Sequence, residues 1–302
     1  MKNFLNNTNY NFIKKFKICG YFSIILILIG FSFLIFKGPE LGIDFKGGTE
    51  IIVDLDDTLL TVNDIKSNLN QYFDKNGINV SNIKSYGTKK IQILVEDSDF
   101  SLSFFKEIIS SYKKNKLSLL SFNKIGSTIS SELSTNAMQA LFIAILLIGF
   151  YIIIRFDWYS SIGSIIAIIH DVLIVVSLLV IFNYQFDINI IAAFLIIIGY
   201  SLNDTIVVFD RIRENFDEYS NMELEKTINL SINETLSRTT ITSLTTLFVL
   251  LSLLIFGGNS LSGLSFALVI GIITGTYSSI FIATPIMMNL RIKYFNEENT
   301  KE

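Results

Sequence analysis

The stretch LIIIGYSLNDTIVVFDR, Leu195 to Arg211, places an asparagine and an aspartate inside an otherwise apolar run. A helix of about 20 mainly apolar residues is long enough to cross the hydrocarbon core of a membrane. An ionised side chain at the centre of such a helix costs about 2.5–3.5 kcal/mol on insertion scales. Asp204 therefore needs either a compensating partner or a function that uses its charge.

The composition of the whole chain agrees with a membrane location for this stretch. Half of the 302 residues are hydrophobic, 17% are charged and 26 are phenylalanine, which is typical of a membrane protein. Six segments are long and apolar enough to span a bilayer: roughly 16–36, 137–155, 160–182, 188–209, 240–256 and 264–288. The sequence thus predicts a polytopic α-helical membrane protein with six transmembrane helices.

Basic residues near the span ends predict the orientation of these helices. They fall on one side of the predicted membrane: Lys14, Lys15, Lys17, Arg155, Arg211, Arg213, Lys226, Arg238, Arg291 and Lys293. The loops NYQFD and GGNSLSG on the other side contain neither Lys nor Arg. Both termini are therefore expected in the cytoplasm of a bacterium, with the chain in its cytoplasmic (inner) membrane. The first span lacks a small-residue cleavage site, so it is expected to remain as an anchor.

The expected domains follow from these spans. They are a cytoplasmic tail (1–15), the first helix (16–36), an extracytoplasmic domain (37–135), helices two to six (136–289) and a second cytoplasmic tail (290–302). Strand patterns in the outer domain cover 49–55, 80–86, 90–96 and 117–123, and helical patterns cover 61–73 and 101–114. The order βαββαβ predicts an α+β, ferredoxin-like fold.

Several function classes find little support in the residues. The chain has one histidine and one cysteine, and it contains no HExxH, GxSxG or Walker phosphate-binding motif. These absences argue against a hydrolase, an ATPase or a cysteine-based metal site. We therefore expect no catalytic residues, no metal, no cofactor and no nucleic-acid partner.

The clearest candidate for chemistry is a pair formed by Asp204 and Arg238. Arg238 stands where the fifth span begins, and the fourth and fifth spans run in opposite directions, so the two side chains lie at similar depth. An arginine that reaches the carboxylate keeps it ionised, whereas an arginine that swings away leaves a buried acid that favours a proton. The pair is therefore a candidate for proton coupling. The alternative is that Asp204 is a structural hydrogen-bond acceptor and Arg238 a positive-inside anchor.

Other polar residues within the spans form a second candidate group. His170 and Asp171 lie near the centre of the third span, and Ser201 precedes Asp204 by nearly one helical turn. With the hydroxyls of the fifth span, they predict a polar network whose candidate members are His170, Asp171, Ser201, Asn203 and Thr242. For His170 and Asp171, a purely structural contact between spans remains an equal alternative.

The sixth span carries small residues four apart. Gly271, Gly275 and Ser279 form the centre of this stripe, which lets a second helix approach closely. The stripe predicts helix packing and no chemistry. Pro285, near the end of the same span, is expected to kink or loosen its last turns.

Four blocks of sequence resemble those of a known family. They are LGIDFKGGTEI after the first span, IGYSLNDTIVVFDRIREN at the fourth, TLSRTTITSLTTL at the fifth and FGGNSLSGLSFALVIGIITGTYSSIFIA in the sixth. Together they resemble the SecF family of protein translocase subunits, which belongs with SecD to the resistance-nodulation-division (RND) superfamily. The family's intramembrane aspartate falls on Asp204 and its arginine on Arg238. Its motif leading into the outer domain falls on Asp44, Gly47 and Gly48.

The resemblance implies a role in protein export. Members of the family work with SecD and use the proton motive force to complete preprotein translocation after the ATP-dependent step of SecA. The implied partners are SecD, the SecYEG channel with SecA, the translocating preprotein, YajC and YidC. Two alternatives stay open at this point: half of a proton-driven RND efflux transporter, and a non-conducting structural scaffold of the channel.

Overall fold

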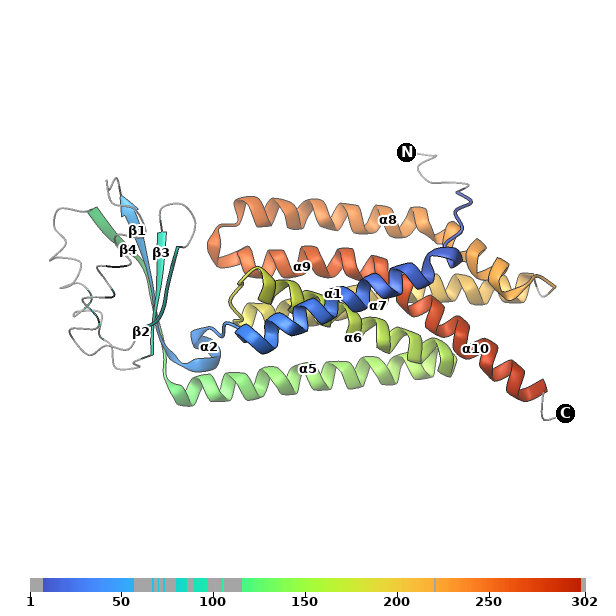
Figure 1. Ribbon diagram of the computed structural model, residues 1–302, viewed down its shortest axis with the longest axis horizontal. Helices are drawn as coiled ribbons and strands as arrows, with labels where there is room; N and C mark the ends of the chain where they lie inside the picture. The colour runs from blue at the N-terminus through green and yellow to red at the C-terminus, as the bar shows by residue number, and fades with distance from the viewer. Residues whose placement is uncertain are drawn as a thin grey trace. The chain divides into compact units, whose positions relative to one another are not determined.

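The computed structural model describes residues 8–56, 67, 70, 73, 80–85, 90–96, 101, 105, 116–219 and 221–299. The chain divides into two compact units. One comprises residues 1–40, 140–184 and 189–302, and its described part is a bundle of long helices (Figure 1). The other comprises residues 41–139 and 185–188 and contains a small β-sheet.

Six helical stretches are long and apolar enough to cross a membrane, which confirms the prediction of six such helices. In chain order they are α1 (Phe16–Lys37, after the 3-10 turn Ile13–Lys15), α5 (Ser127–Arg155), α6 (Trp158–Ile181), α7 (Ile188–Glu218), α8 (Leu224–Phe256) and the run of α9 (Asn259–Ser278), a π-helical turn (Ser279–Ala283) and α10 (Thr284–Asn299). The start of α1 and the end of α10 lie at the same end of the bundle (Figure 1).

Helices α6, α7 and α9 pack closely because small residues face their neighbours. A Cβ atom on Gly163 would lie 2.7 Å from the carbonyl oxygen of Ala283, and one on Gly275 would lie 3.1 Å from Cβ of Ser201. A Cβ on Gly271 would overlap the side chain of Ile197. Close backbone approach of this kind is how helices associate where apolar burial alone gives little preference. It brings the polar residues of these three helices within hydrogen-bonding distance.

Helices α7 and α8 extend well past the apolar segments predicted at 188–209 and 240–256. The extensions contain charged residues, and polar contacts join them. Arg211 donates to Glu234 at 2.7 Å, and Asn215 donates to Ser231 at 2.9 Å. These contacts between α7 and α8 therefore stabilise helical turns that lie outside the apolar segments, which the sequence pattern alone does not predict.

The helical path changes just before Pro285. Ser279–Ala283 form a π-helical turn, and the Thr284 hydroxyl donates to the Ser279 carbonyl at 2.8 Å. Proline has no N–H and its ring crowds the carbonyl one turn earlier, so the helix widens at this point. The disturbance predicted from Pro285 is present as a π turn ahead of the proline.

The second unit contains four antiparallel strands in the order β2-β3-β1-β4. Their bounds are β1 Gly48–Asp56, β2 Val80–Ser85, β3 Lys90–Val95 and β4 Lys116–Ile125, so all four predicted strands are present. Apolar side chains of the sheet are buried, among them Ile51, Ile83, Ile91 and Ile93. The predicted helices 61–73 and 101–114 lie outside the described residues except for positions 67, 70, 73, 101 and 105.

Candidate functional site

Two carboxylates are buried among the helices of the bundle. Asp171 on α6 is 0% exposed and Asp204 on α7 is 1% exposed. Both lie on helices of the closely packed group described above, and each accepts hydrogen bonds from hydroxyl groups of neighbouring helices. Hydroxyl donors offset part of the cost of burying an acid without neutralising its charge.

Asp204 is held from two sides. Its Oδ2 atom accepts hydrogen bonds from Thr276 on α9 at 3.0 Å and from Ser243 on α8 at 3.4 Å. Ser243 and Thr276 also contact each other at 2.7 Å. The carboxylate thus sits at the junction of α7, α8 and α9. Among the described residues, no basic side chain forms a salt bridge with it.

Arg238 lies on α8, roughly one and a half turns before Ser243, or about 7.5 Å along the helix axis. Its side chain is exposed. Ser243 of the same helix contacts Asp204, whereas Arg238 forms no salt bridge with this carboxylate in the described part of the chain. The two members of the predicted pair are therefore neighbours on adjacent helices, with the arginine turned outward.

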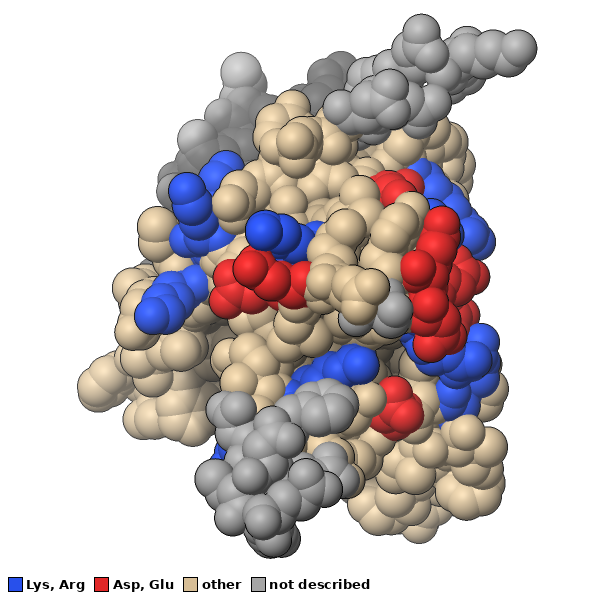
Figure 2. Space-filling view, turned by 90° about the vertical axis from the view of Figure 1, so that its right-hand side faces the viewer, with Lys and Arg blue, Asp and Glu red and all other residues tan. Residues whose placement is uncertain are grey.

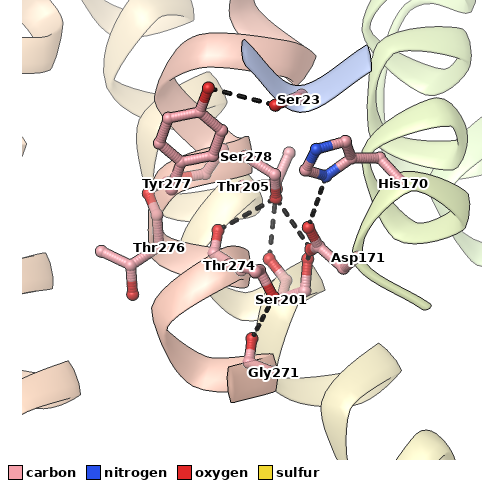
Figure 3. Close-up of polar contacts among 12 residues, drawn as sticks. Ser23, His170, Asp171, Ser201, Thr205, Gly271, Thr274, Thr276, Tyr277 and Ser278 are labelled. Atoms are coloured by element: carbon pink, nitrogen blue, oxygen red, sulfur yellow. Dashed lines mark hydrogen bonds and ion pairs between the residues drawn. The ribbon is translucent and has the colours of Figure 1, made fainter. Parts of the chain in front are cut away.

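Asp171 anchors a second polar cluster, drawn in Figure 3. Its Oδ2 atom accepts from Ser201 on α7 at 2.6 Å and from Ser278 on α9 at 2.8 Å. Its Oδ1 atom lies 2.9 Å from Nδ1 of His170. Three of the predicted network residues, His170, Asp171 and Ser201, are thus brought together by contacts among α6, α7 and α9.

Two other predicted network residues lie elsewhere. Asn203 and Thr242 are both exposed. The Thr242 hydroxyl donates within its own helix, to the carbonyl oxygens of Arg238 at 3.1 Å and Thr239 at 2.9 Å. In the described part of the chain neither side chain hydrogen-bonds to the carboxylate of Asp171 or Asp204. The helical rotation of α7 explains the difference for Asn203, because adjacent residues on a helix point about 100° apart.

Three consecutive residues of α9 were not predicted as part of the site. Thr276 bonds to Asp204, and Ser278 bonds to Asp171. Between them, Tyr277 stacks on the His170 ring with centroids 6.2 Å apart. The Thr276 side chain points away from the Asp171 cluster in Figure 3. The sequence indicates these residues only by the polar run GTYSS within an apolar helix. This run overlaps the stripe of small residues, which indicates helix packing.

The predicted packing residues of the sixth span lie beside this run. Gly271 and Gly275 face Ile197 and Ser201 of α7. Ser279 is fully buried, and its hydroxyl donates to the carbonyl oxygen of Thr276 at 2.9 Å. The glycines therefore allow the close approach that sets Ser201 and Ser278 around one carboxylate.

The motif Asp44, Gly47 and Gly48 belongs to the sheet unit. Asp44 lies in the short helix α2 (Ile43–Lys46), and Gly47 and Gly48 follow it. Asp44 accepts a hydrogen bond from the backbone N–H of Ile188, the first residue of α7, at 2.9 Å. Gly47 and Gly48 have φ values of +76° and +113°, which favour glycine. A Cβ on Gly48 would also overlap the carbonyl oxygen of Val95.

Charged side chains of both signs gather at the end of the bundle shown in Figure 2. Arg155 of α5 pairs with Asp210 of α7 at 2.9 Å, and both are partly exposed. Arg211 pairs with Glu214 and Glu234. Exposed pairs of this kind contribute only about 0–1 kcal/mol each, so we interpret them as a solvated face at the membrane edge. Within the described ranges, no three His, Cys, Asp or Glu side chains converge as metal ligands.

Comparison with known proteins gives consistent matches over the chain. Residues 105–293 match the family model described as protein export membrane protein SecD/SecF, C-terminal, and residues 32–58 match the SecD/SecF GG motif. The protein translocase subunit SecF of Rhodothermus marinus is 41% identical over 298 residues, covering 95% of both chains. The protein of the same name from Petrotoga mobilis is 36% identical, covering 93% of this chain and 96% of the relative.

Solved structures agree with these matches. The crystal structure of SecDF, a translocon-associated membrane protein from Thermus thermophilus, superposes with a TM-score of 0.86 at 32% identity. The superposition covers 96% of this chain and 40% of that chain. A SecDF structure in a super-membrane-facing form gives a TM-score of 0.74 at 30% identity, covering 99% and 41%. This chain therefore spans about two fifths of the SecDF chains that it matches.

Proposed function

We propose that this chain, which belongs to the SecD/SecF family of protein export membrane proteins, uses a transmembrane proton gradient to help complete preprotein translocation. Family membership confirms the resemblance found in the four sequence blocks. Its full-length relatives carry the name protein translocase subunit SecF, so the chain is a SecF-type translocase subunit, a transport component. Proton coupling is the part of the function that we add from the site.

The observation that carries the proposal is the environment of Asp204. A carboxylate that is 1% exposed and held by the hydroxyls of Thr276 and Ser243 has hydrogen-bond donors but, within the described residues, no opposite charge in contact. Such a group is costly when ionised. Arg238 is on the adjacent helix and turned outward. The cost of burying the ionised Asp204 can be relieved either by proton uptake or by inward movement of Arg238. The two exclude each other, because a protonated Asp204 has no charge to attract Arg238.

The energies involved are comparable. Ionisation at a span centre costs about 2.5–3.5 kcal/mol on insertion scales, and a membrane potential supplies about 2.3 kcal/mol per charge per 100 mV. A gradient of ordinary size is therefore large enough to shift the balance between a protonated Asp204 and an Asp204 that attracts Arg238. Because Asp204 contacts α8 and α9, each state favours a different arrangement of these helices.

SecD is the partner proposed first. The SecDF chains are more than twice as long as the region matched here, which supports a unit made of this chain and a SecD counterpart. We extend this to the export pathway that the family serves, with the SecYEG channel, SecA, YajC, YidC and the preprotein as further partners. We propose that the sheet unit, which contains the GG motif, is the part of the chain that acts on a preprotein.

The orientation follows from charge. Lys and Arg side chains are present at the charged end of the bundle (Figure 2), which is the end where α1 begins and α10 ends (Figure 1). Arg155, the last residue of α5, and Arg211 of α7 are both partly exposed. Excess Lys and Arg marks the cytoplasmic side. We therefore propose that the chain lies in the inner membrane with both termini in the cytoplasm and with the sheet unit as an extracytoplasmic domain. The strand order β2-β3-β1-β4 supports a ferredoxin-like domain, since a βαββαβ chain produces this order.

The decisive experiment replaces one carboxylate. In vesicles that contain the chain with SecD and the channel, Asp204→Asn should keep the hydrogen bonds to Thr276 and Ser243 but lose the acid. We expect the gradient-dependent part of translocation to fall to the level of vesicles without the chain, while assembly is retained. Asp210→Asn, on the same helix at the solvated end, is the matched control and should keep the coupling. Full coupling in Asp204→Asn would leave only a scaffold function.

Arg238 is tested separately. Arg238→Ala should abolish gradient-dependent translocation, because the second state of the pair then has no positive charge. Arg238→Lys should retain part of the gradient-dependent translocation if the site uses only the positive charge, and none of it if the site requires the planar guanidinium. Arg213, on the exposed surface of α7, provides the control: Arg213→Ala should leave the coupling unchanged.

A further inference from the structure

His170 has an unusual combination of contacts. It is 7% exposed, in the interior of α6, next to the fully buried Asp171. Its Nδ1 atom lies 2.9 Å from Oδ1 of Asp171. Its other ring nitrogen, Nε2, is buried and has no hydrogen-bond partner among the described residues. Nδ1 is therefore held by Asp171, whereas Nε2 has no hydrogen bond within the described residues.

The contacts of Asp171 indicate where the imidazole hydrogen lies. The Oδ2 atom accepts from two serine hydroxyls, Ser201 and Ser278, an arrangement that stabilises an ionised carboxylate. Nδ1 then donates to Oδ1, as an orienting carboxylate normally requires. Nε2 is left as a bare acceptor, and a buried acceptor without a partner is less rare than a buried N–H without one.

The ring also connects Asp171 to α1. Tyr277 of α9 stacks on His170 with an interplanar angle of 27°. The Tyr277 hydroxyl donates to the backbone carbonyl of Cys19 at 2.6 Å and accepts from Ser23 at 3.1 Å. Figure 3 shows His170 between Asp171 and the Tyr277–Ser23 contact. A change of charge on the imidazole would act on α6, α9 and α1 together.

We propose that His170 is a second proton-binding group of the helical bundle, with Asp171 as its fixed counter-charge. A hydronium ion transfers a proton to the lone pair of Nε2 and leaves as water, the neutral imidazole becomes an imidazolium, and the Nδ1–H bond to Asp171 is kept. The positive charge then faces one negative charge beside it and the face of Tyr277, an arrangement that stabilises a cation. The inference extends the proposed proton coupling, but it depends on different side chains.

The groups that face the pair support this assignment. From α7 comes the uncharged Ser201, from α9 Tyr277 and Ser278, and from α1 the backbone of Cys19. The other buried acid, Asp204, is bonded to Thr276 and Ser243 and not to this cluster. In the described part of the bundle, Asp171 is thus the one charged group in contact with His170.

The composition of the chain offers a direct test, because it has a single histidine. Full-length chain carrying ¹⁵N-histidine, purified with a tag that contains none, is combined with unlabelled SecD in lipid vesicles. Nitrogen NMR then reports the tautomer and charge of His170 alone. We expect the Nδ1–H tautomer at high pH and reversible conversion to imidazolium when the pH is lowered. An Nε2–H tautomer, or a state that does not change before the chain unfolds in acid, would overturn the proposal.

Variants separate this inference from the proposed function. Asp204→Asn should leave the His170 titration in place, so loss of coupling in that variant and titration of His170 are independent results. Asp171→Asn should move the conversion to lower pH, since the counter-charge is gone. If the titration is the same in Asp171→Asn, the proposed pairing is wrong.

His170→Asn tests whether the titration of His170 affects translocation. The amide of this variant can still donate to Asp171 but cannot become charged. Gradient-dependent translocation in this variant should lose its dependence on pH over the range in which His170 titrates, with assembly unchanged. Ser23→Ala removes a contact of Tyr277 without removing a titrating group and should keep the wild-type pH profile. A His170→Asn profile that matches the wild type would contradict the proposal.

Discussion

The bundle contains two kinds of apolar helix. In α6, α7 and the α9–α10 run, about half of the residues of an apolar 18-residue stretch are buried inside the chain (56%, 50% and 56%). In α1, α5 and α8, the buried share of the corresponding stretch is 11%, 11% and 17%. All six are similar in hydropathy, so the difference comes from packing. Both buried carboxylates belong to the first kind, and Arg238 to the second. Acids are held where protein surrounds them, and the arginine lies on a surface available to lipid or a partner.

The largest expected effect comes from removing a buried acid. Asp171→Ala leaves Ser201, Ser278 and His170 without their shared acceptor, and each buried donor left unsatisfied costs about 1–3 kcal/mol. Denaturant unfolding of the purified chain in detergent measures this change. Asp210→Ala, which removes a partly exposed pair with Arg155, should cost about 0–1 kcal/mol. Equal losses in the two variants would remove the distinction between the buried and exposed helices.

Glycines give a second contrast of intermediate size. Gly271→Ala forces a Cβ into Ile197 across the α9–α7 contact and should destabilise the chain by about 1–3 kcal/mol. Gly20→Ala on α1 meets no atom within 4 Å and should be neutral or stabilise the helix by up to about 1 kcal/mol. Thermal unfolding in detergent compares them. Adding Ile197→Ala should recover part of the Gly271→Ala loss, and failure to recover any would argue against this contact.

The smallest effect distinguishes two faces of one helix. Ser243→Ala on α8 removes a hydroxyl bonded to Asp204 and Thr276, a loss of about 0.5–1.5 kcal/mol. Ser252, on the exposed face, bonds only to the Phe248 carbonyl of its own helix, and Ser252→Ala should change stability by no more than about 0.5 kcal/mol. Denaturant midpoints of the two variants measured side by side would show whether α8 has a buried polar face.

Sequence patterns were sufficient for the six long helices and the four strands but not for the site as a whole. Long apolar runs predicted six helices, and alternating residues predicted four strands. The patterns could not separate Ser201, which faces Asp171, from the exposed Asn203, because both are polar residues beside Asp204. They also gave no reason to choose Thr276 and Ser278 over other hydroxyls. The pairing of Asp204 with Arg238 in proton transfer stays a prediction.

By itself, the sequence determined which segments are apolar enough for a membrane, where the charged groups fall along them and which family the chain resembles. These properties are local, because they depend on side-chain hydropathy, spacing and residue order. Only the tertiary structure decided that α6, α7 and α9 pack together and that Asp171 and Asp204 have separate sets of donors. It alone also decided that Nε2 of His170 has no hydrogen-bond partner among the residues that the structure describes. The reason is that hydropathy does not specify which face of an apolar helix meets a neighbour, whereas a hydrogen bond between helices requires one particular rotation of each.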